Sequence, residues 1–158
     1  MARDKSLSGV AGWLRFLVII IFISGAFNVL LSIGGLDWKG LEKVNPELLH
    51  HAGFQNLQLA DRVLGFLSGA ILIYAGFLLL KRKVLGTITS VKRIVGVFFP
   101  LIVLVRYIVT PYLFMGIPPS EFLGSDPEML KDIAKTLIWA AIWFSYLHRS
   151  NRVKNTYQ

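Results

Sequence analysis

The chain has 158 residues, of which 54% are apolar and only 16% are charged, and its mean hydropathy is +0.60. Soluble domains are about 45–50% apolar and about 25% charged, so the composition favours one membrane domain, residues 1–158, over a soluble protein. The net charge of +8 comes from basic residues at the ends of apolar runs, which argues against a nucleic-acid partner. The absence of cysteine excludes disulfides, thiolate metal sites and a cysteine nucleophile.

The first predicted transmembrane helix covers residues 16–36, after a short basic N-terminal segment. A signal peptide also begins with basic residues, but its apolar region has about 7–15 residues, and this apolar run is longer. We therefore expect a helix that is retained in the mature protein. Within it, Ser24, Asn28 and Ser32 recur at every fourth position and form one polar stripe on the helix.

The polar segment after this helix contains Asn45, Pro46 and Glu47, which are typical of a helix start. We expect a short helix over residues 46–52 that lies on the extracytoplasmic surface of the membrane.

The second predicted span covers residues 63–80, between Arg62 and Lys81. Gly65 and Gly69 form a pair of small residues separated by three positions, and such pairs allow helices to approach closely in lipid. This pattern predicts helix packing and no more specific function.

The third predicted span, residues 94–115, contains Arg106 near its middle and two prolines, Pro100 and Pro111. At about 1.5 Å per residue, it is long enough to cross a hydrocarbon core about 30 Å thick. An arginine at the bilayer centre costs about 2.5–3.5 kcal/mol on insertion scales, so we expect Arg106 to face the bundle interior and to have a partner.

Asn28, Tyr74 and Trp139 lie at about the depth of Arg106 when helix rise is counted from the ends of their spans. The sequence therefore predicts a mid-membrane cluster of these four residues. We expect no carboxylate of this chain at that depth. Two interpretations of Arg106 remain open: a structural residue that fixes helix register, or a binding residue for an anion, a lipid headgroup or an acidic residue of a partner's helix.

The fourth predicted span, residues 130–148, is the least apolar, with Lys131 and Lys135 placed to extend toward the headgroups. If the N-terminus is cytoplasmic, most of the 17 lysines and arginines lie on the cytoplasmic side, and of the nine acids only Asp4 joins them. The positive-inside rule thus predicts an all-α four-helix transmembrane bundle with both termini in the cytoplasm.

Residues near the two ends of the chain match a recognisable pattern. The matching residues are Gly12, Trp13 and Leu14 at the start, and Trp143, Tyr146, Ser150, Arg152, Val153, Lys154, Thr156 and Tyr157 at the end. This pattern resembles that of a family of small bacterial membrane proteins, domain of unknown function 2569, with Ser145 in place of an expected proline and Tyr157 in place of an expected phenylalanine. The resemblance implies a bacterial cytoplasmic membrane protein with four spans, and it implies no activity.

The basic residues Arg149, Arg152 and Lys154 form a candidate cytoplasmic docking segment. Positive-inside bias and binding to anionic lipid headgroups explain such a cluster, at about 1 kcal/mol per basic residue near the surface. The alternative is that the ordered Arg-Val-Lys pattern docks a cytoplasmic partner.

Catalytic and phosphate-binding motifs are absent from the sequence, so we predict no enzyme, no catalytic residue and no cofactor. His50 and His51 are adjacent and do not share a helix face, so we predict no metal site. The leading hypothesis is a non-enzymatic accessory or interaction protein of the inner membrane, with a membrane-protein partner or a homo-oligomer. The alternative is a carrier or flippase-like protein for an anionic solute or lipid that uses Arg106.

Overall fold

The computed structural model describes residues 9–34, 50, 52–81, 85–116, 118–120 and 127–157. Across this described part the protein is all-α, with helices and turns and no strand, as predicted. The short helix predicted over residues 46–52 lies mostly outside the described residues.

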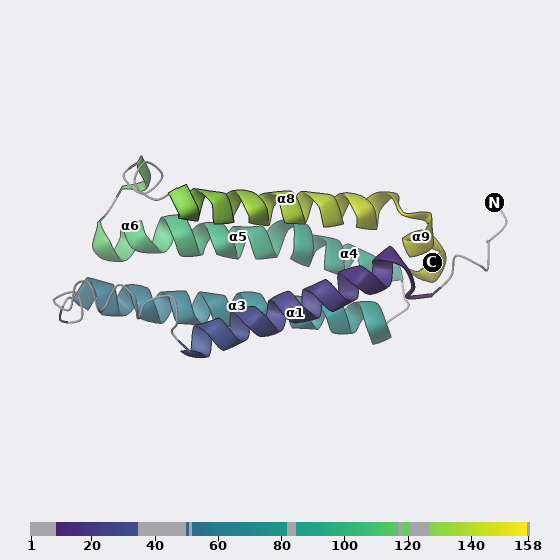
Figure 1. Cartoon of the computed structure of the whole chain (residues 1–158), viewed down its shortest axis with the longest axis horizontal. Helices are drawn as coiled ribbons and strands as arrows, with labels where there is room; N and C mark the ends of the chain where they lie inside the picture. Colours follow the sequence, from purple (N-terminus) through teal and green to yellow (C-terminus); the bar gives the residue numbers. More distant parts are fainter. Residues whose placement is uncertain are drawn as a thin grey trace.

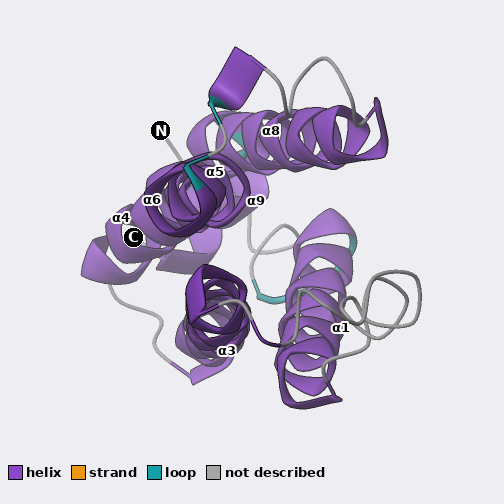
Figure 2. Cartoon of the chain, turned by 90° about the vertical axis from the view of Figure 1, so that its left-hand side faces the viewer, coloured by secondary structure: helices purple, strands orange, loops and turns teal. Residues whose placement is uncertain are grey.

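The apolar runs of the sequence form long helices. In chain order the elements are α1 (Trp13–Gly34), α3 (Ala52–Lys81), α4 (Leu85–Arg93), the π-helical turn η3 (Ile94–Phe98), α5 (Phe99–Leu104), the π-helical turn η4 (Val105–Val109), α6 (Thr110–Met115), α8 (Pro127–Arg149) and α9 (Asn151–Tyr157). The elements from α4 to α6 follow one another without a break and act as one long helix. Successive long helices run in alternate directions (Figure 1). In the end-on view, α1 and α3 form one side of the bundle, and α5 and α8 form the other (Figure 2).

Three helices of the described part are long and apolar enough to cross a membrane: Trp13–Gly34, Ala52–Lys81 and Gly86–Met115. Large apolar side chains on their outer faces are exposed, among them Phe27 and Leu30 on α1. In water such faces would form an extended apolar patch, whereas lipid solvates them well. The three helices are therefore compatible with a multi-pass membrane protein.

The helix that contains the predicted second span is longer than the span itself. We expected it to begin after Arg62, because a charged residue usually ends a transmembrane segment. Helix α3 instead begins at Ala52, well before Asp61 and Arg62, and its sequence between Gly53 and Gly65 contains no helix breaker. The side chain of Asp61 is buried against the bundle, so its charge does not oppose an apolar environment outside the helix.

Helices α1 and α3 touch through their backbones at two glycines. A Cβ atom added to Gly69 would lie 2.5 Å from the carbonyl oxygen of Gly25, and one added to Gly25 would lie 2.9 Å from the carbonyl oxygen of Gly69. Further along the pair, an added Cβ at Gly76 would lie 2.9 Å from the ring of Phe22. These contacts confirm the prediction that the small residues of the second span serve helix packing.

Both π-helical turns precede a proline. The N–H of Phe99 donates to the carbonyl of Ile94, and Pro100 follows; the N–H of Thr110 donates to the carbonyl of Val105, and Pro111 follows. A proline has no N–H and its ring crowds the carbonyl four residues earlier, so the helix widens by one residue before it. The widened turns let the third membrane helix continue through both prolines.

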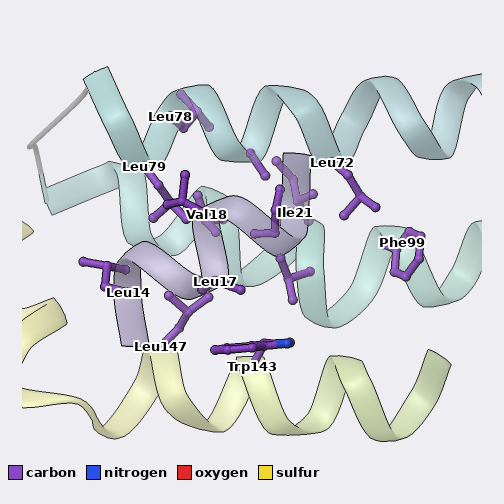
Figure 3. Close-up of a cluster of buried hydrophobic side chains, with 14 of the residues drawn as sticks. Leu14, Leu17, Val18, Ile21, Leu72, Leu78, Leu79, Phe99, Trp143 and Leu147 are labelled. Carbon is purple, nitrogen blue, oxygen red and sulfur yellow. The ribbon is translucent and has the colours of Figure 1, made fainter. Parts of the chain in front are cut away.

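The apolar core is largest near the end of the bundle where α1 begins and α8 ends. Leu14, Leu17 and Ile21 of α1 face Trp143 and Leu147 of α8 (Figure 3). The ring of Phe16 also lies 6.1 Å from that of Trp143, centroid to centroid. The first and last long helices therefore meet at this end, which we call the basic end because Lys92, Arg93 and Arg149 lie there.

The C-terminal helix α9 closes the basic end. The hydroxyl of Tyr157 donates to the carbonyl of Leu79, which is in the last turn of α3, where carbonyls lack partners within the helix. The hydroxyl of Thr156 accepts a hydrogen bond of 3.0 Å from the N–H of Gly9 and donates one of 2.7 Å to the carbonyl of Arg152. The C-terminal helix thus joins both the start of the described chain and the end of α3.

Replacing Tyr157 by phenylalanine is expected to lower the free energy of unfolding by about 1 kcal/mol, since the hydroxyl is lost and the Leu79 carbonyl stays buried. The measurement is thermal unfolding in detergent. Tyr74→Phe is the matched control, because the side chain of Tyr74 is 56% exposed. An equal loss of stability in both variants would contradict the capping role of Tyr157.

The burial of Tyr157 predicts a pH dependence. Burial, with a smaller effect of Tyr146, raises the pKa of Tyr157 from 10.0 to about 12. Between these values the unfolded chain has lost the proton while the folded chain keeps it, so stability falls as pH rises through this range. We expect wild-type protein to lose stability between pH 10 and 12 more steeply than Tyr157→Phe, which lacks the titrating group.

Candidate functional site

Arg106 of η4 and Asp61 of α3 form a buried ion pair between two of the long helices. Nη2 of Arg106 donates to Oδ2 of Asp61 over 2.9 Å, and Nε of Arg106 donates to Oδ1. The side chains are 10% and 9% exposed, respectively. Two parallel hydrogen bonds between a guanidinium and a carboxylate make the strongest and most directional form of ion pair. The expectation that this chain offers no carboxylate to Arg106 was therefore wrong.

Further buried polar side chains lie on the helices that carry the pair and on α1. Ser32 of α1, Ser68 of α3 and Thr110 at the start of α6 are all buried. The hydroxyl of Ser32 donates to the carbonyl of Asn28 over 2.6 Å, and that of Ser68 donates to the carbonyl of Gly65 over 2.8 Å. We call the set Ser32, Asp61, Gly65, Ser68, Arg106 and Thr110 the polar cluster.

Gly65 makes the close approach of three helices possible. A Cβ atom at this position would lie 2.2 Å from the Ser32 hydroxyl oxygen and 3.5 Å from Nη1 of Arg106. The missing side chain therefore leaves the space in which α1, α3 and η4 converge. A larger residue here would force the Ser32 hydroxyl to move from its present position.

The π-helical turn at Arg106 has a side-chain bond of its own. In a regular helix, the carbonyl of Arg106 would accept from the N–H of Thr110, but that N–H bonds to Val105 instead. The hydroxyl of Thr110 donates to the Arg106 carbonyl over 2.6 Å and takes the place of the lost bond. Proline, π-turn and threonine together hold the backbone that carries Arg106. Segments of this kind are often found at functional sites.

The ion pair lies toward the end of the bundle that is opposite the basic end. Asp61 precedes Lys81, the last residue of α3, by about 20 residues, and Arg106 follows Leu85, the first residue of α4, by about 21 residues, so each lies roughly 30 Å along its helix from the basic end. Both values exceed half the thickness of a hydrocarbon core of about 30 Å. The polar cluster is therefore in the half of the bundle away from the basic end.

The other members of the predicted cluster lie elsewhere. Asn28 donates its amide to the carbonyl of Ser24 in its own helix, over 2.8 Å. The side chain of Tyr74 is exposed on the outer face of α3. The ring of Trp139 packs edge-on against that of Phe99, with centroids 5.4 Å apart. The structure brings Ser32, one turn beyond Asn28, toward Arg106 in their place.

The spacing of residues in the sequence indicates that Asp61 is buried, although its charge suggests an exposed position. Asp61, Gly65, Ser68 and Leu72 recur at intervals of three or four residues and share the buried face of α3. Extending this face backward from the small residues of the second span would have placed Asp61 inside the bundle. Arg62, the next residue, is exposed.

The predicted docking residues lie at the basic end. Arg149 and Lys154 are exposed and Arg152 is partly buried. Within the same pattern, Val153 and Thr156 are buried. Alternate residues of the C-terminal signature therefore serve the fold, while its cations remain at the surface.

In the residues that the structure describes, no group of three or more histidines and acids could hold a metal ion. These residues form an all-α protein, and its three long apolar helices are compatible with a multi-pass membrane protein. A buried ion pair joins two of these helices. The chain belongs to the family described as protein of unknown function (DUF2569), whose model matches residues 7–158. This match confirms the resemblance found from the two ends of the sequence. No curated protein and no solved structure matches the chain.

Proposed function

We propose that the chain crosses a bacterial cytoplasmic membrane four times, with α8 as the fourth span and both termini in the cytoplasm. The hydrogen bond between Gly9 and Thr156 supports an even number of crossings, because it joins the start and the end of the described chain. Helix α8 runs alongside the third membrane helix over most of its length (Figure 1). The cations of the basic end favour the cytoplasmic side.

Within that membrane, we propose a non-enzymatic accessory or interaction role. The observation that carries this proposal is the pairing of Arg106 with Asp61. Because a carboxylate of the same chain neutralises the guanidinium, Arg106 serves to hold two membrane helices in register. A carrier would need Arg106 free to meet an anion from water.

The outer faces of the helices are the surfaces on which a partner would act. On α1, exposed Trp13, Phe16, Ile23 and Phe27 form an apolar face that lipid or a second helix can cover. Van der Waals packing with such a face requires no charge and no catalytic group.

The test is native mass spectrometry of the protein purified in mild detergent, together with co-purification of two differently tagged copies. We expect a homo-oligomer, or a partner at fixed stoichiometry that binds again after both components are purified separately. A monomer in every detergent, with no partner that rebinds, would contradict the proposal. Anion uptake into vesicles that contain only this protein would support a carrier instead.

A further inference from the structure

A pocket of about 190 Å³ lies at the basic end, between α4, α8 and α9. Its floor is formed by Leu147, Val153 and Tyr157, all of which belong to the buried core. Its rim carries Lys92 from α4, His148 from α8 and Lys154 from α9. Three separate elements thus bring one basic side chain each to the same hollow.

The rim of the pocket gathers positive charge. Nζ of Lys92 lies 3.5 Å from Nδ1 of His148. In the part of the chain that the structure describes, neither Lys92 nor Lys154 forms an ion pair with a carboxylate. Basic groups that face one hollow without an acid form a favourable site for an anion, and a phosphate can accept hydrogen bonds from all of them.

The floor distinguishes this site from a row of basic residues on a surface. Tyr157 is fixed by its bond to Leu79, and Val153 is buried beside it. The floor is therefore built by the packing of α9 and does not depend on a ligand. A cationic rim above an apolar floor suits a molecule with an anionic head and an apolar body.

From this arrangement we propose that the pocket binds the phosphate headgroup of an anionic phospholipid in the leaflet at the basic end. The lipid phosphate lies between Lys92, His148 and Lys154, and its glycerol and upper acyl chain cover the apolar floor. This assignment rests on the proposed membrane topology, which puts the basic end at the headgroup level. Basic pockets between membrane helices on the cytoplasmic side bind acidic headgroups in this way.

The experiment titrates purified protein in detergent with phosphatidylglycerol or phosphatidylcholine and counts bound lipids by native mass spectrometry. The test variant is Lys92→Gln with Lys154→Gln. The matched control is Arg93→Gln with Arg149→Gln, because these arginines are exposed at the same end, outside the pocket lining, and the charge change is equal. At about 1 kcal/mol per basic residue, the test variant is expected to bind phosphatidylglycerol roughly 10- to 30-fold more weakly than wild type.

We expect wild type and control to retain one phosphatidylglycerol in preference to phosphatidylcholine. Lys92→Arg with Lys154→Arg is expected to keep the preference, and thermal unfolding checks that every variant is folded. Equal weakening in the control, or equal binding of both lipids, would overturn the proposal. Displacement of the lipid by an equal concentration of glycerol phosphate would assign the pocket to a soluble phosphate. Because the same spectra report the oligomeric state, failure of the lipid site and failure of the proposed function are separate outcomes.

Discussion

Replacing Asp61 by alanine is expected to destabilise the protein by about 3–5 kcal/mol, because it leaves the buried guanidinium of Arg106 without a carboxylate. Arg106→Leu is expected to have a similar effect, since it leaves Asp61 buried with its charge uncompensated. The measurement is the midpoint of thermal or denaturant unfolding in detergent, with the amount of protein in the membrane as a second readout.

The matched control is Asp132→Ala, which removes an ion pair that lies at the surface. Lys135 and Asp132 are 2.9 Å apart, but their side chains are 70% and 51% exposed, so this pair contributes about 1 kcal/mol or less. If Asp61→Ala cost no more than Asp132→Ala, the ion pair would not stabilise the bundle. That result would also contradict the proposal that Arg106 holds two helices in register.

A double variant separates a structural pair from a binding site. Replacing both Asp61 and Arg106 by leucine removes both charges, and such replacement of a buried pair is often neutral or stabilising. If the pair holds the helices in register, the double leucine variant should be far more stable than either single variant and should keep its oligomeric state. A folded double variant that loses its partner would assign a binding role to the pair.

Replacing Gly69 by alanine is expected to destabilise the contact between α1 and α3 by about 1–3 kcal/mol, as overpacking does. The new methyl group would lie 2.5 Å from the carbonyl oxygen of Gly25 and 2.7 Å from Cγ2 of Val29. A backbone carbonyl cannot rotate away as a side chain does, so α1 must move. The measurement is the unfolding midpoint under the conditions used for Asp61.

The control for this substitution is Gly86→Ala. No atom lies within 4 Å of a Cβ at Gly86, which is exposed in α4. Alanine is favoured over glycine in helices by about 1 kcal/mol, so this variant should be neutral or more stable. Equal stability of the Gly69 and Gly86 variants would mean that the two helices are not held in contact at Gly69.

The all-α class, the approximate course of the membrane helices and the packing role of Gly65 and Gly69 followed from apolar runs and small residues. These features are local, so hydropathy and spacing determine them. The start of α3 did not follow, because the rule that a charge ends a span holds only for charges that face lipid. Asp61 faces Arg106, and the pairing of two distant segments is not visible in either one alone.

Arg106 was expected to face inward with a partner, and the structure confirms this expectation. Its predicted neighbours were chosen by depth, which gives a residue's height along a helix but not its face. Tyr74 shows the difference, since the buried face of α3 passes through Leu72 and Ala75 and leaves Tyr74 on the outside. Depth was also counted from the ends of the predicted spans, and helix α3 begins well before its predicted span. The choice of partner therefore required the helix positions themselves.

The C-terminal signature shows a further limit of sequence patterns. From the sequence, its basic residues were predicted to form a docking segment, and Thr156 and Tyr157 were used only to recognise the family. In the fold, Thr156 forms a hydrogen bond with Gly9, and Tyr157 forms one with Leu79 at the end of α3. The reason is long-range: the partners lie at the start and in the middle of the chain. No local pattern predicts such contacts.

The arrangement of the chain in the membrane can be measured directly with single cysteines, because the natural sequence contains none. Exposed Ala11 and Asn151 report on the basic end, and exposed Ser120 reports on the opposite end. In spheroplasts treated with a membrane-impermeant maleimide, we expect Ser120→Cys to be labelled at once, and Ala11→Cys and Asn151→Cys only after permeabilisation. Labelling of Ala11→Cys and Asn151→Cys from opposite sides of the membrane would contradict four crossings and both ends in the cytoplasm.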